Sequence, residues 1–335
     1  MKHTIKDIAK LAGVSKATVS RVLNNSKPVS EEIKKKVLAV IEETQYQPSQ
    51  IARSLINKET KLIGVLIPDV SNSVFSKIIQ GVELEAIKHG YNVLLCNSRY
   101  DEKVELEYLD ILRDKEVDGL IYHGFKSTSV IEDKLKHFNK PVVMIGIGPM
   151  STDLPVVMID NKKAAYEATQ HIIELGHKRI GMIHGPLEDP FAGNDRYDGY
   201  RTALKDAGID LDTTIIEEGH YKLNDGYRAM NRLLEAKPLP TAVFCANDEM
   251  AIGAIKCSID NGFKVPEDIS FVGFDDIDIA GIYSPSVTTI SQPFNEKGVS
   301  AIQLLMKLIN GKEVNHRIVH DHRLIKREST RKLEK

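Results

Sequence analysis

The sequence predicts a small all-helical unit at the amino-terminus, followed by a larger α/β body built on doubly wound parallel sheets. Two observations carry this prediction. Apolar residues recur at helical spacing before about residue 45, and from Leu62 onward short apolar runs of strand length alternate with helical patterns. The length of 335 residues corresponds to about two domains of roughly 150 residues each.

Composition places the chain among ordinary globular proteins. Hydrophobic residues make up 42% and charged residues 27%, which excludes a membrane protein and a disordered chain. No run reaches the roughly 18 uncharged apolar residues of a membrane span, and residues 1–4 open no signal-peptide pattern, so we expect a cytoplasmic protein. Cys96, Cys245 and Cys257 are odd in number and far apart, which predicts buried thiols without a disulfide framework or a CxxC site.

Charge is unevenly distributed along the chain. Residues 1–60 hold eleven Lys and Arg against six Asp and Glu, a net charge of +5, so the remainder carries −7 within the overall −2. A basic head on an acidic body suggests a polyanionic partner. Solvated Lys-rich helix faces are also common, so charge alone does not decide the matter.

The amino-terminal segment predicts three short helices. The first covers residues 4–12 with Thr4 as its N-cap and ends at Gly13, Ser15 caps the second, and the third begins at Ser30. Two short helices joined through a glycine turn form a helix-turn-helix. A helical hairpin with a solvated polar face has the same periodicity, so periodicity alone leaves both interpretations open.

In a helix-turn-helix the second helix lies in the major groove with its amino-terminal residues at the base edges. This makes Lys16, Ala17 and Arg21 the candidate base-reading residues. Arg21 is favoured because its planar fork can bond guanine O6 and N7 together, whereas Ala17 offers only a methyl contact to thymine. Short hydroxyl and amide side chains suit phosphate contacts, and the candidates are Thr4, Ser15, Thr18, Ser20 and Asn24.

The same segment carries a resemblance to a known family. Residues 4–15 (TIKDIAKLAGVS) and 17–24 (ATVSRVLN) resemble the signature of the lac repressor (LacI/GalR) family of transcription regulators. The resemblance continues through Tyr46, Pro48 and residues 52–55, and through most of the chain to about residue 328. It implies a DNA-binding headpiece (1–47), a hinge helix and linker (48–60), a two-lobed effector-binding and dimerisation domain (61–328) and a polar tail (329–335).

The resemblance also implies a role for the hinge. In the family this segment is a short helix that forms on the operator, enters the minor groove and inserts a leucine between base pairs. Leu55 matches that leucine, and Ala52 matches a small residue near the groove floor. Unstacking a base step costs about a few kcal/mol, and the resulting bend lets more protein surface contact the DNA. Ile56 departs from the polar or basic residue of some relatives. Without the family, Ile51 and Leu55 would form an ordinary amphipathic turn.

The body contains nine apolar runs of strand length, which predict two doubly wound lobes. They are residues 62–67, 91–96, 119–122, 142–147, 156–159, 180–184, 214–217, 242–246 and 269–274. The body of the family resembles periplasmic sugar-binding proteins, whose lobes are joined by three crossovers. We place these crossovers near residues 160, 290 and 320.

Polar residues follow most of these strands, at the edge where open α/β sheets bind ligands. Carboxylates, amides and an arginine suit a polyol, because each can bond neighbouring hydroxyls while an aromatic ring covers the apolar sugar face. The candidate effector-binding residues are Asp69, Phe75, Asp160, Arg196, Tyr221, Asn247, Asp248 and Asp275, with Ser71, Asn72, Asn161, Phe191 and Asp276 beside them. An Asp after a strand often only caps the next helix, and that alternative stays open for each one.

The resemblance sharpens this set. Arg196 and Asp275 match the effector-binding arginine and aspartate of the family, and Phe75 and Tyr221 match pocket aromatics. The aromatic that Tyr221 matches is found in the purine repressor, which the chain also resembles over residues 185–188 (GPLE). That repressor has an arginine where Asp189 stands here, which favours a sugar over a purine.

Together these features predict a repressor of carbohydrate-utilisation genes that couples operator affinity to a sugar or sugar derivative bound between the lobes. Two other modes of the family stay open: a global regulator co-activated by a phosphocarrier protein, and a purine-type repressor that depends on a corepressor. The tail has no leucine heptad, so we expect a homodimer that reads pseudo-palindromic double-stranded DNA with half-sites about 34 Å apart. No membrane partner and no cofactor are expected.

Enzymes and exported binding proteins are the rival classes. The chain has no P-loop, no HExxH and no GxSxG, and residues 146–148 lack the third glycine of a dinucleotide fingerprint, so we expect no catalytic activity. His316, His320 and His322 alternate with other residues in an apparent strand and predict no metal site. A pure solute-binding protein would need an export signal and would have no headpiece.

Overall fold

The computed structural model describes residues 3–24, 28–46, 59–126, 128–146 and 153–333. The chain divides into two compact units, Met1–Lys61 and Leu62–Lys335, and each is described by itself. None of the helices in these ranges is both long enough and apolar enough to cross a bilayer.

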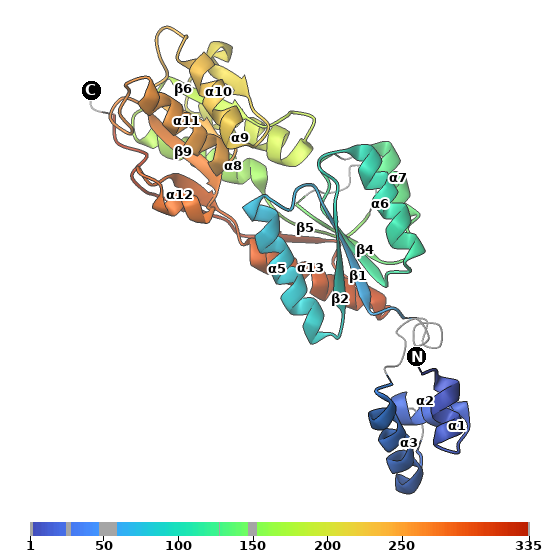
Figure 1. The fold of residues 1–335 in the computed structure, drawn as a ribbon. Coiled ribbons are helices and arrows are strands. Elements are labelled where there is room, and N and C mark those ends of the chain that lie inside the picture. The colour runs from blue at the N-terminus through green and yellow to red at the C-terminus, as the bar shows by residue number, and fades with distance from the viewer. Residues whose placement is uncertain (1–2, 25–27, 47–58, 127, 147–152, 334–335) are drawn as a thin grey trace. The chain divides into compact units, whose positions relative to one another are not determined.

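The described part of the first unit consists of helices α1 (Ile5–Leu11), α2 (Lys16–Asn24) and α3 (Glu31–Thr44) (Figure 1). The backbone N–H and the hydroxyl of Thr4 both donate to the Asp7 carboxylate at 2.8 Å, and the Ser15 hydroxyl accepts the Thr18 N–H at 3.1 Å. Gly13 has a φ of +66°, a left-handed conformation that glycine adopts without strain, and it separates α1 from α2. The three predicted helices are confirmed, and they enclose a small core of Ile8, Ala9, Val19, Val22 and Val37.

The first lobe of the second unit has a six-stranded parallel sheet in the order β11-β5-β4-β3-β1-β2. Its strands are β1 (Leu62–Ile67), β2 (Asn92–Asn97), β3 (Gly119–Tyr122), β4 (Val142–Ile145), β5 (Val156–Ile159) and β11 (Arg317–His320). Helices α5 (Ser73–Lys88) and α13 (Phe294–Ile309) cover one face, and α6 (Glu102–Asp114) and α7 (Ser129–Lys136) cover the other (Figure 1). Residues of β1 alternate between the two cores, as a strand buried on both faces requires.

The second lobe has a sheet in the order β12-β10-β9-β8-β6-β7, parallel except for β12 at its edge. Its strands are β6 (Ile180–His184), β7 (Ile216–Glu218), β8 (Ala242–Cys245), β9 (Ser270–Asp275), β10 (Thr288–Ser291) and β12 (Arg323–Ile325). Helices α8 (Asn161–Glu174) and α9 (Arg196–Asp206) pack on one face, and α10 (Leu223–Leu233), α11 (Asp248–Asp260) and α12 (Asp278–Ile282) lie on the other. The predicted pair of doubly wound lobes is therefore present.

The chain passes between the lobes three times. It crosses after β5 at residue 160, after β10 at residues 292–293, and between β11 and β12 at residues 321–322. These positions confirm the crossovers expected near residues 160, 290 and 320.

Several strand boundaries differ from those expected. The run 142–147 stops as a strand at Ile145, because Gly146 has a φ of +74° and turns the chain. The run 214–217 begins as a 3₁₀ turn (Thr213–Ile215), since the Asp212 carboxylate accepts the Thr214 N–H and starts a turn there. Strand β10 was not expected, because two of its three buried residues are threonines and it lacks an apolar run.

The carboxyl-terminal residues up to 333 belong to the second lobe. Ser329 is buried; its hydroxyl donates to the Phe271 carbonyl at 2.6 Å and accepts the Thr288 N–H at 2.8 Å. The Leu333 N–H donates to the Leu175 carbonyl at 2.8 Å. Residues 329–333, which were predicted to belong to a polar tail (329–335), thus include residues that pair with the lobe through their polar groups.

Candidate functional site

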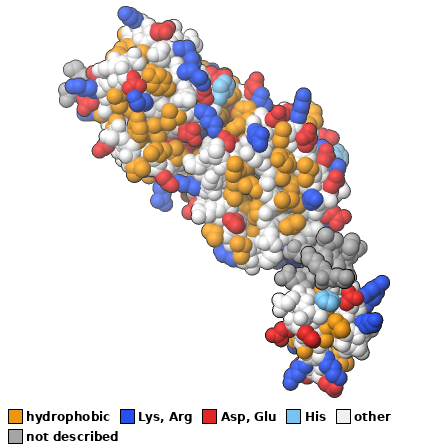
Figure 2. Space-filling view, viewed as in Figure 1, with side chains coloured by type: hydrophobic (Ala, Val, Ile, Leu, Met, Phe, Trp, Pro, Cys, Tyr) orange, Lys and Arg blue, Asp and Glu red, His pale blue; other side chains and the backbone are white. Residues whose placement is uncertain are grey.

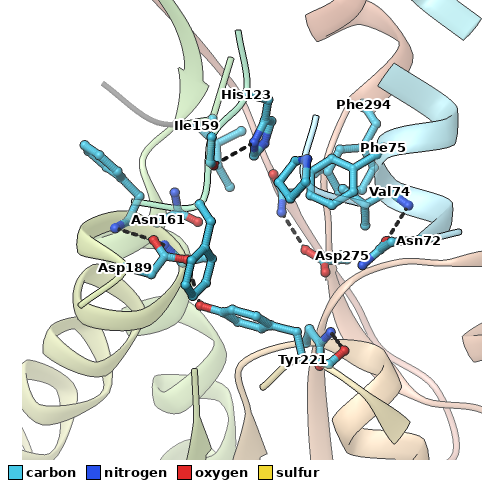
Figure 3. A pocket seen from close by; sticks show the side chains of 18 of the residues that line it. Asn72, Val74, Phe75, His123, Ile159, Asn161, Asp189, Tyr221, Asp275 and Phe294 are labelled. Atoms are coloured by element: carbon cyan, nitrogen blue, oxygen red, sulfur yellow. Dashed lines mark hydrogen bonds between the residues drawn. The ribbon is translucent and has the colours of Figure 1, made fainter. Parts of the chain in front are cut away.

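A pocket lies between the two lobes, at the carboxyl ends of both sheets (Figure 3). The first lobe contributes an apolar wall with Phe75 from α5, Phe125 after β3 and Phe294 from α13. His123 packs edge-on against Phe75, with ring centroids 4.8 Å apart. Burial lowers the pKa of His123 to about 4, so its ring is neutral and belongs to this wall.

Arg196 is held in the pocket by three polar contacts. It begins α9 directly after a π-helical turn, Pro190–Asp195, and it is buried. Its Nε donates to Asn161 Oδ1 at 3.0 Å, its Nη1 donates to the Ala246 carbonyl at 2.5 Å, and its Nη2 lies 3.6 Å from Asp275 Oδ1. These contacts fix the plane of the guanidinium before any ligand arrives.

Asp275 ends β9 and lies beside Arg196 in the pocket. Its φ of +113° is strained for a residue with a Cβ, which is typical of positions held for a function. Oδ1 accepts the Gln292 amide at 2.7 Å, while Oδ2 has no hydrogen-bond partner among the described residues. Burial raises the pKa of Asp275, and Arg196 opposes this shift by favouring the carboxylate. The carboxylate thus keeps one oxygen for a ligand.

Tyr221 and Asp189 form a second polar pair in the pocket. The Tyr221 hydroxyl donates to Asp189 Oδ2 at 2.8 Å, and Asp189 Oδ1 accepts the N–H groups of Phe191 and Ala192 at 3.0 Å each. The Asn247 amide donates to the Tyr221 carbonyl at 2.9 Å and so holds the loop that carries the ring. Asp189 is occupied by these three donors, so its main effect is to position Tyr221 (Figure 3).

Five of the eight predicted effector residues line this pocket: Phe75, Arg196, Tyr221, Asn247 and Asp275. Phe191 lines it as well. Their common feature is a position just after a strand or in the first turns of the next segment, where the topology brings both sheets' carboxyl ends together.

The other three predicted residues have structural partners outside the pocket. Asp248 is buried beneath it, where it accepts the Thr289 hydroxyl at 2.6 Å and the Ile277 N–H at 2.9 Å. Asp160 is exposed and caps α8 by accepting the Lys163 N–H at 2.9 Å. Asp69 pairs with Lys222 at 2.5 Å and thereby bridges the lobes. Asp160 fits the capping alternative, whereas Asp248 and Asp69 have other structural partners.

Several lining residues were absent from the predicted set. They are Tyr100, His123, Asp189, Gln292, Phe294 and Lys297, while Asn72 and Asn161 had been noted only as neighbours. His123 follows β3 directly, so the strand-end rule should have included it. Gln292, Phe294 and Lys297 follow β10, and missing that strand removed the signal that marks them.

In the first unit, α2 presents the predicted base-reading side chains to solvent. Lys16, Ala17 and Arg21 are exposed, while Val19 and Val22 on the opposite side of the helix are buried. The space-filling view shows Lys and Arg side chains at the surface of this unit (Figure 2). Thr4 and Ser15 are exposed and Thr18 and Ser20 half-buried; the side chain of Asn24, and Ala52 and Leu55 of the predicted hinge, lie outside the described residues.

The predicted cysteine and histidine environments can also be compared with the structure. Cys96, Cys245 and Cys257 are free and buried, as expected. His320 contacts Ser300 at 3.1 Å and His322 contacts Glu167 at 3.0 Å, so the two rings have separate partners. Within the described ranges, no group of three or more His, Cys, Asp or Glu is arranged to hold a metal ion.

Comparison with known proteins agrees with both units. Residues 4–49 match the family of bacterial regulatory proteins described as the lacI family. Residues 60–328 match the model of periplasmic binding proteins and the sugar binding domain of the LacI family. The chain belongs to the LacI family. It is therefore a DNA-binding transcriptional regulator with a sugar-binding type of body.

Individual LacI-family relatives extend over nearly the whole chain. The HTH-type transcriptional regulator RegA of Clostridium saccharobutylicum is 41% identical over 331 residues, which cover 98% of this chain and 100% of RegA. The lac repressor dimer bound to operator and the anti-inducer ONPF has a TM-score of 0.90 at 29% identity, covering 99% of this chain and 100% of that one. A complex of the regulator CelR with cellobiose has a TM-score of 0.76 at 31% identity, covering 98% and 100%.

Proposed function

We propose that this LacI-family regulator is a repressor of carbohydrate-utilisation genes whose operator affinity is controlled by a sugar or sugar derivative bound between its lobes. The observation that carries the proposal is the pair Arg196 and Asp275, a fixed guanidinium and a carboxylate with one unpaired oxygen, facing an apolar wall. Asp275 can accept ligand hydroxyls and Arg196 can donate to ring or hydroxyl oxygens, while Phe75 and Tyr221 cover the apolar face of the ring.

Effector binding is coupled to the relative position of the lobes. The pocket takes residues from both lobes, and three ion pairs join the lobes around it: Asp69 with Lys222, Lys77 with Asp278, and Lys126 with Glu188. A ligand that contacts both walls stabilises the arrangement in which these pairs form. Strand β1 begins at Leu62, directly after the linker, so a lobe movement reaches the linker through the chain itself.

Operator reading is assigned to α2 and the hinge. We infer that Arg21, Lys16 and Ala17 read bases, that Thr4, Ser15, Thr18, Ser20 and Asn24 contact phosphates, and that Leu55 and Ala52 enter the minor groove. The exposure of the three base-reading side chains above a buried Val19 and Val22 supports the first assignment. A protein that binds chromosomal operators works in the cytoplasm. Binding DNA and a sugar requires no catalytic step.

Homodimerisation is proposed because both lobes expose large apolar side chains. On the first lobe, Leu84 and Ile87 of α5 are 53% and 60% exposed, and Leu95 lies on the edge strand β2. Figure 2 shows apolar side chains gathered over this region. On the second lobe, Ile282 is 80% exposed. Apolar patches of this kind mark protein–protein interfaces, and a symmetric dimer matches a pseudo-palindromic operator.

The test is to sequence genomic fragments retained by the purified protein at moderate salt, because phosphate contacts make binding steeply salt-dependent. We expect enrichment of one pseudo-palindrome beside carbohydrate genes, and release or tightening when the matching sugar is added. If DNA fragments are enriched only when a purine is added, the protein is a purine-type repressor and not a sugar-controlled one. If they are enriched only when a phosphocarrier protein is added, the protein is a global regulator. No enriched sequence under any of these conditions would contradict the proposal.

A further inference from the structure

Lys297 is a buried cationic side chain that lines the pocket. The binding of a neutral sugar gives its charge no partner. Lys297 lies in the first turn of α13, its residue is 3% exposed, and it lines the pocket. Its Nζ donates to Gln292 Oε1 at 2.9 Å and lies 4.6 Å from the centroid of the Phe294 ring. An ammonium group carries three donors, so this pattern leaves donors to be filled by a ligand.

Among the described residues of the pocket, no carboxylate forms a direct ion pair with Lys297. Throughout the described ranges, no Asp or Glu oxygen forms a salt bridge with its Nζ. The same Gln292 side chain donates to Asp275 and accepts from Lys297, so it separates the two charges instead of letting them pair. Burial lowers the pKa of Lys297 to about 7; the charge of Arg196 adds to this shift and that of Asp275 opposes it.

The two carboxylates that line the pocket have contacts with groups other than Lys297. Asp189 accepts three hydrogen bonds from Tyr221 and the turn after it, and Asp275 Oδ1 faces Gln292 and Arg196. The pocket therefore presents two buried cationic side chains, Arg196 and Lys297; the carboxylate of Asp275 influences Lys297 from beyond Gln292, but among the described residues it forms no direct ion pair with Lys297. A buried charge is costly unless it is paired, and a ligand anion would supply that partner.

We propose that the effector carries an anionic group, a carboxylate or a phosphate, that binds against Lys297 Nζ. The inference rests on the proposed function and narrows it to acidic sugars: aldonates, uronates or sugar phosphates. The hydroxyls of such a ligand bind at Arg196 and Asp275, and its anionic end lies toward α13, against the Phe294 side of the pocket. A neutral sugar would leave the ammonium desolvated and incompletely bonded, so the site discriminates against it.

Matched ligand pairs test this charge preference directly. Full-length protein is screened by thermal shift and then by titration calorimetry against glucose, glucuronate, gluconate and glucose 6-phosphate, and against galactose with galacturonate and ribose with ribose 5-phosphate. Citrate, phosphoenolpyruvate and inorganic phosphate complete the set as anions that are not sugars. The variants are Lys297→Met, which removes the charge at similar volume, Lys307→Met on the exposed side of the same helix as a control, and Arg196→Ala.

The proposal predicts binding of an acidic member at least tenfold tighter than its neutral partner, a loss of at least tenfold in Lys297→Met, and no loss in Lys307→Met. Comparing the affinities of the sugar carboxylates with those of the sugar phosphates shows which of the two anionic groups the site prefers. A neutral sugar that binds as tightly as its acid, or an acid whose affinity is unchanged in Lys297→Met, would overturn it.

Failure of the sugar function gives a different result. If only the non-sugar anions bind, and Lys297→Met abolishes that binding, the anion site stands and the sugar assignment fails. If Arg196→Ala loses every ligand while Lys297→Met loses none, the sugar pocket stands and the anion site fails. If nothing in the set binds the wild-type protein, both are contradicted. Circular dichroism of Lys297→Met checks that its fold is intact.

Discussion

The guanidinium carbon of Arg196 lies 3.7 Å from the centroid of the Phe274 ring, so the charged plane is stacked on an aromatic face. Phe274 is a core residue of β9, and the next residue along the strand is Asp275. One strand end therefore both supports the cation and supplies its carboxylate neighbour. This arrangement holds the donors of Arg196 in place, which reduces the ordering cost of binding a ligand.

Replacing Arg196 should separate effector binding from DNA binding. Arg196→Ala removes the donors and leaves Asp275 without its cation, so we expect the effector affinity to fall more than tenfold, about 1.4 kcal/mol or more. Operator affinity without effector should be unchanged, as measured by fluorescence anisotropy. Arg201→Ala, an exposed change on the same helix, is the matched control. A full effector response in Arg196→Ala would move the site elsewhere.

The ion pair between Asp69 and Lys222 should contribute to lobe closure. Its side chains are 18% and 42% exposed, so we expect the pair to be worth roughly 0.2–1 kcal/mol, measured as a loss of effector affinity of about 1.4- to fivefold in Lys222→Ala. The double variant with Asp69→Ala should lose little more, and high salt should shrink the difference because the pair is screened. Additive losses from the two single changes would mean that the pair does not act as a unit.

Arg21 should set one base of the operator. Arg21→Ala is expected to cost about 1–3 kcal/mol at the preferred sequence and to relax specificity at one position in each half-site. Selection of operators from a random library by both proteins would reveal that position. Lys36→Ala in α3, where the lysine pairs with Glu32, serves as a charge-matched control. An identical preferred sequence in Arg21→Ala would remove Arg21 from the reading residues.

The affinity for an anionic effector should depend on pH through Lys297. Its pKa in the free protein is about 7, and a bound anion raises it, so binding takes up a proton above that pH. We expect affinity to be flat below pH 7 and to fall by up to about tenfold per unit as pH rises toward 9. Arg196, Asp275, His123 and His320 face or influence this group; both histidine pKa values are lowered, so these rings are neutral across the window.

The comparison with Lys297→Met isolates this contribution. The variant should show no fall in affinity between pH 7 and 9 when measured by calorimetry. The free protein should behave in the opposite sense: because the folded-state pKa of Lys297 lies below its ordinary value of 10.5, the unfolded state binds more protons above pH 7, and stability relative to Lys297→Met rises with pH. Parallel pH curves for the two proteins would contradict the assignment.

Local signals in the sequence predicted much of the fold. Thr4 and Ser15 mark helix starts because each forms its capping hydrogen bond with a residue only three positions along the chain, Asp7 and Thr18. Runs such as residues 62–67 and 156–159 match strands without error, since both faces of a parallel strand must be apolar. Topology then brings the strand ends together, whereas the choice of Arg196 and Asp275 as the main ligand-binding residues came from the resemblance to the LacI family.

Partners distant in sequence account for what was missed. Thr288 and Thr289 are buried in β10 because Ser329 and Asp248 satisfy their polar groups, and no local pattern reveals such partners. Asp248 was predicted to bind the effector for the same reason. It follows a strand as a ligand-binding carboxylate does, and only the structure shows that Thr289 and Ile277 are its partners. From the sequence alone, Lys297 looks like an ordinary lysine of a helix. Only the packing of α13 against the pocket shows that it is buried.

The two strands nearest the carboxyl-terminus belong to different lobes, and this has a consequence for biosynthesis. Strand β11 completes the first sheet, β12 completes the second, and the pairing of Ser329 with Phe271 follows. Neither lobe can reach its final structure until the last segment of the polypeptide has been synthesised. A chain that stopped before residue 317 would therefore lack an edge strand in each of the two sheets.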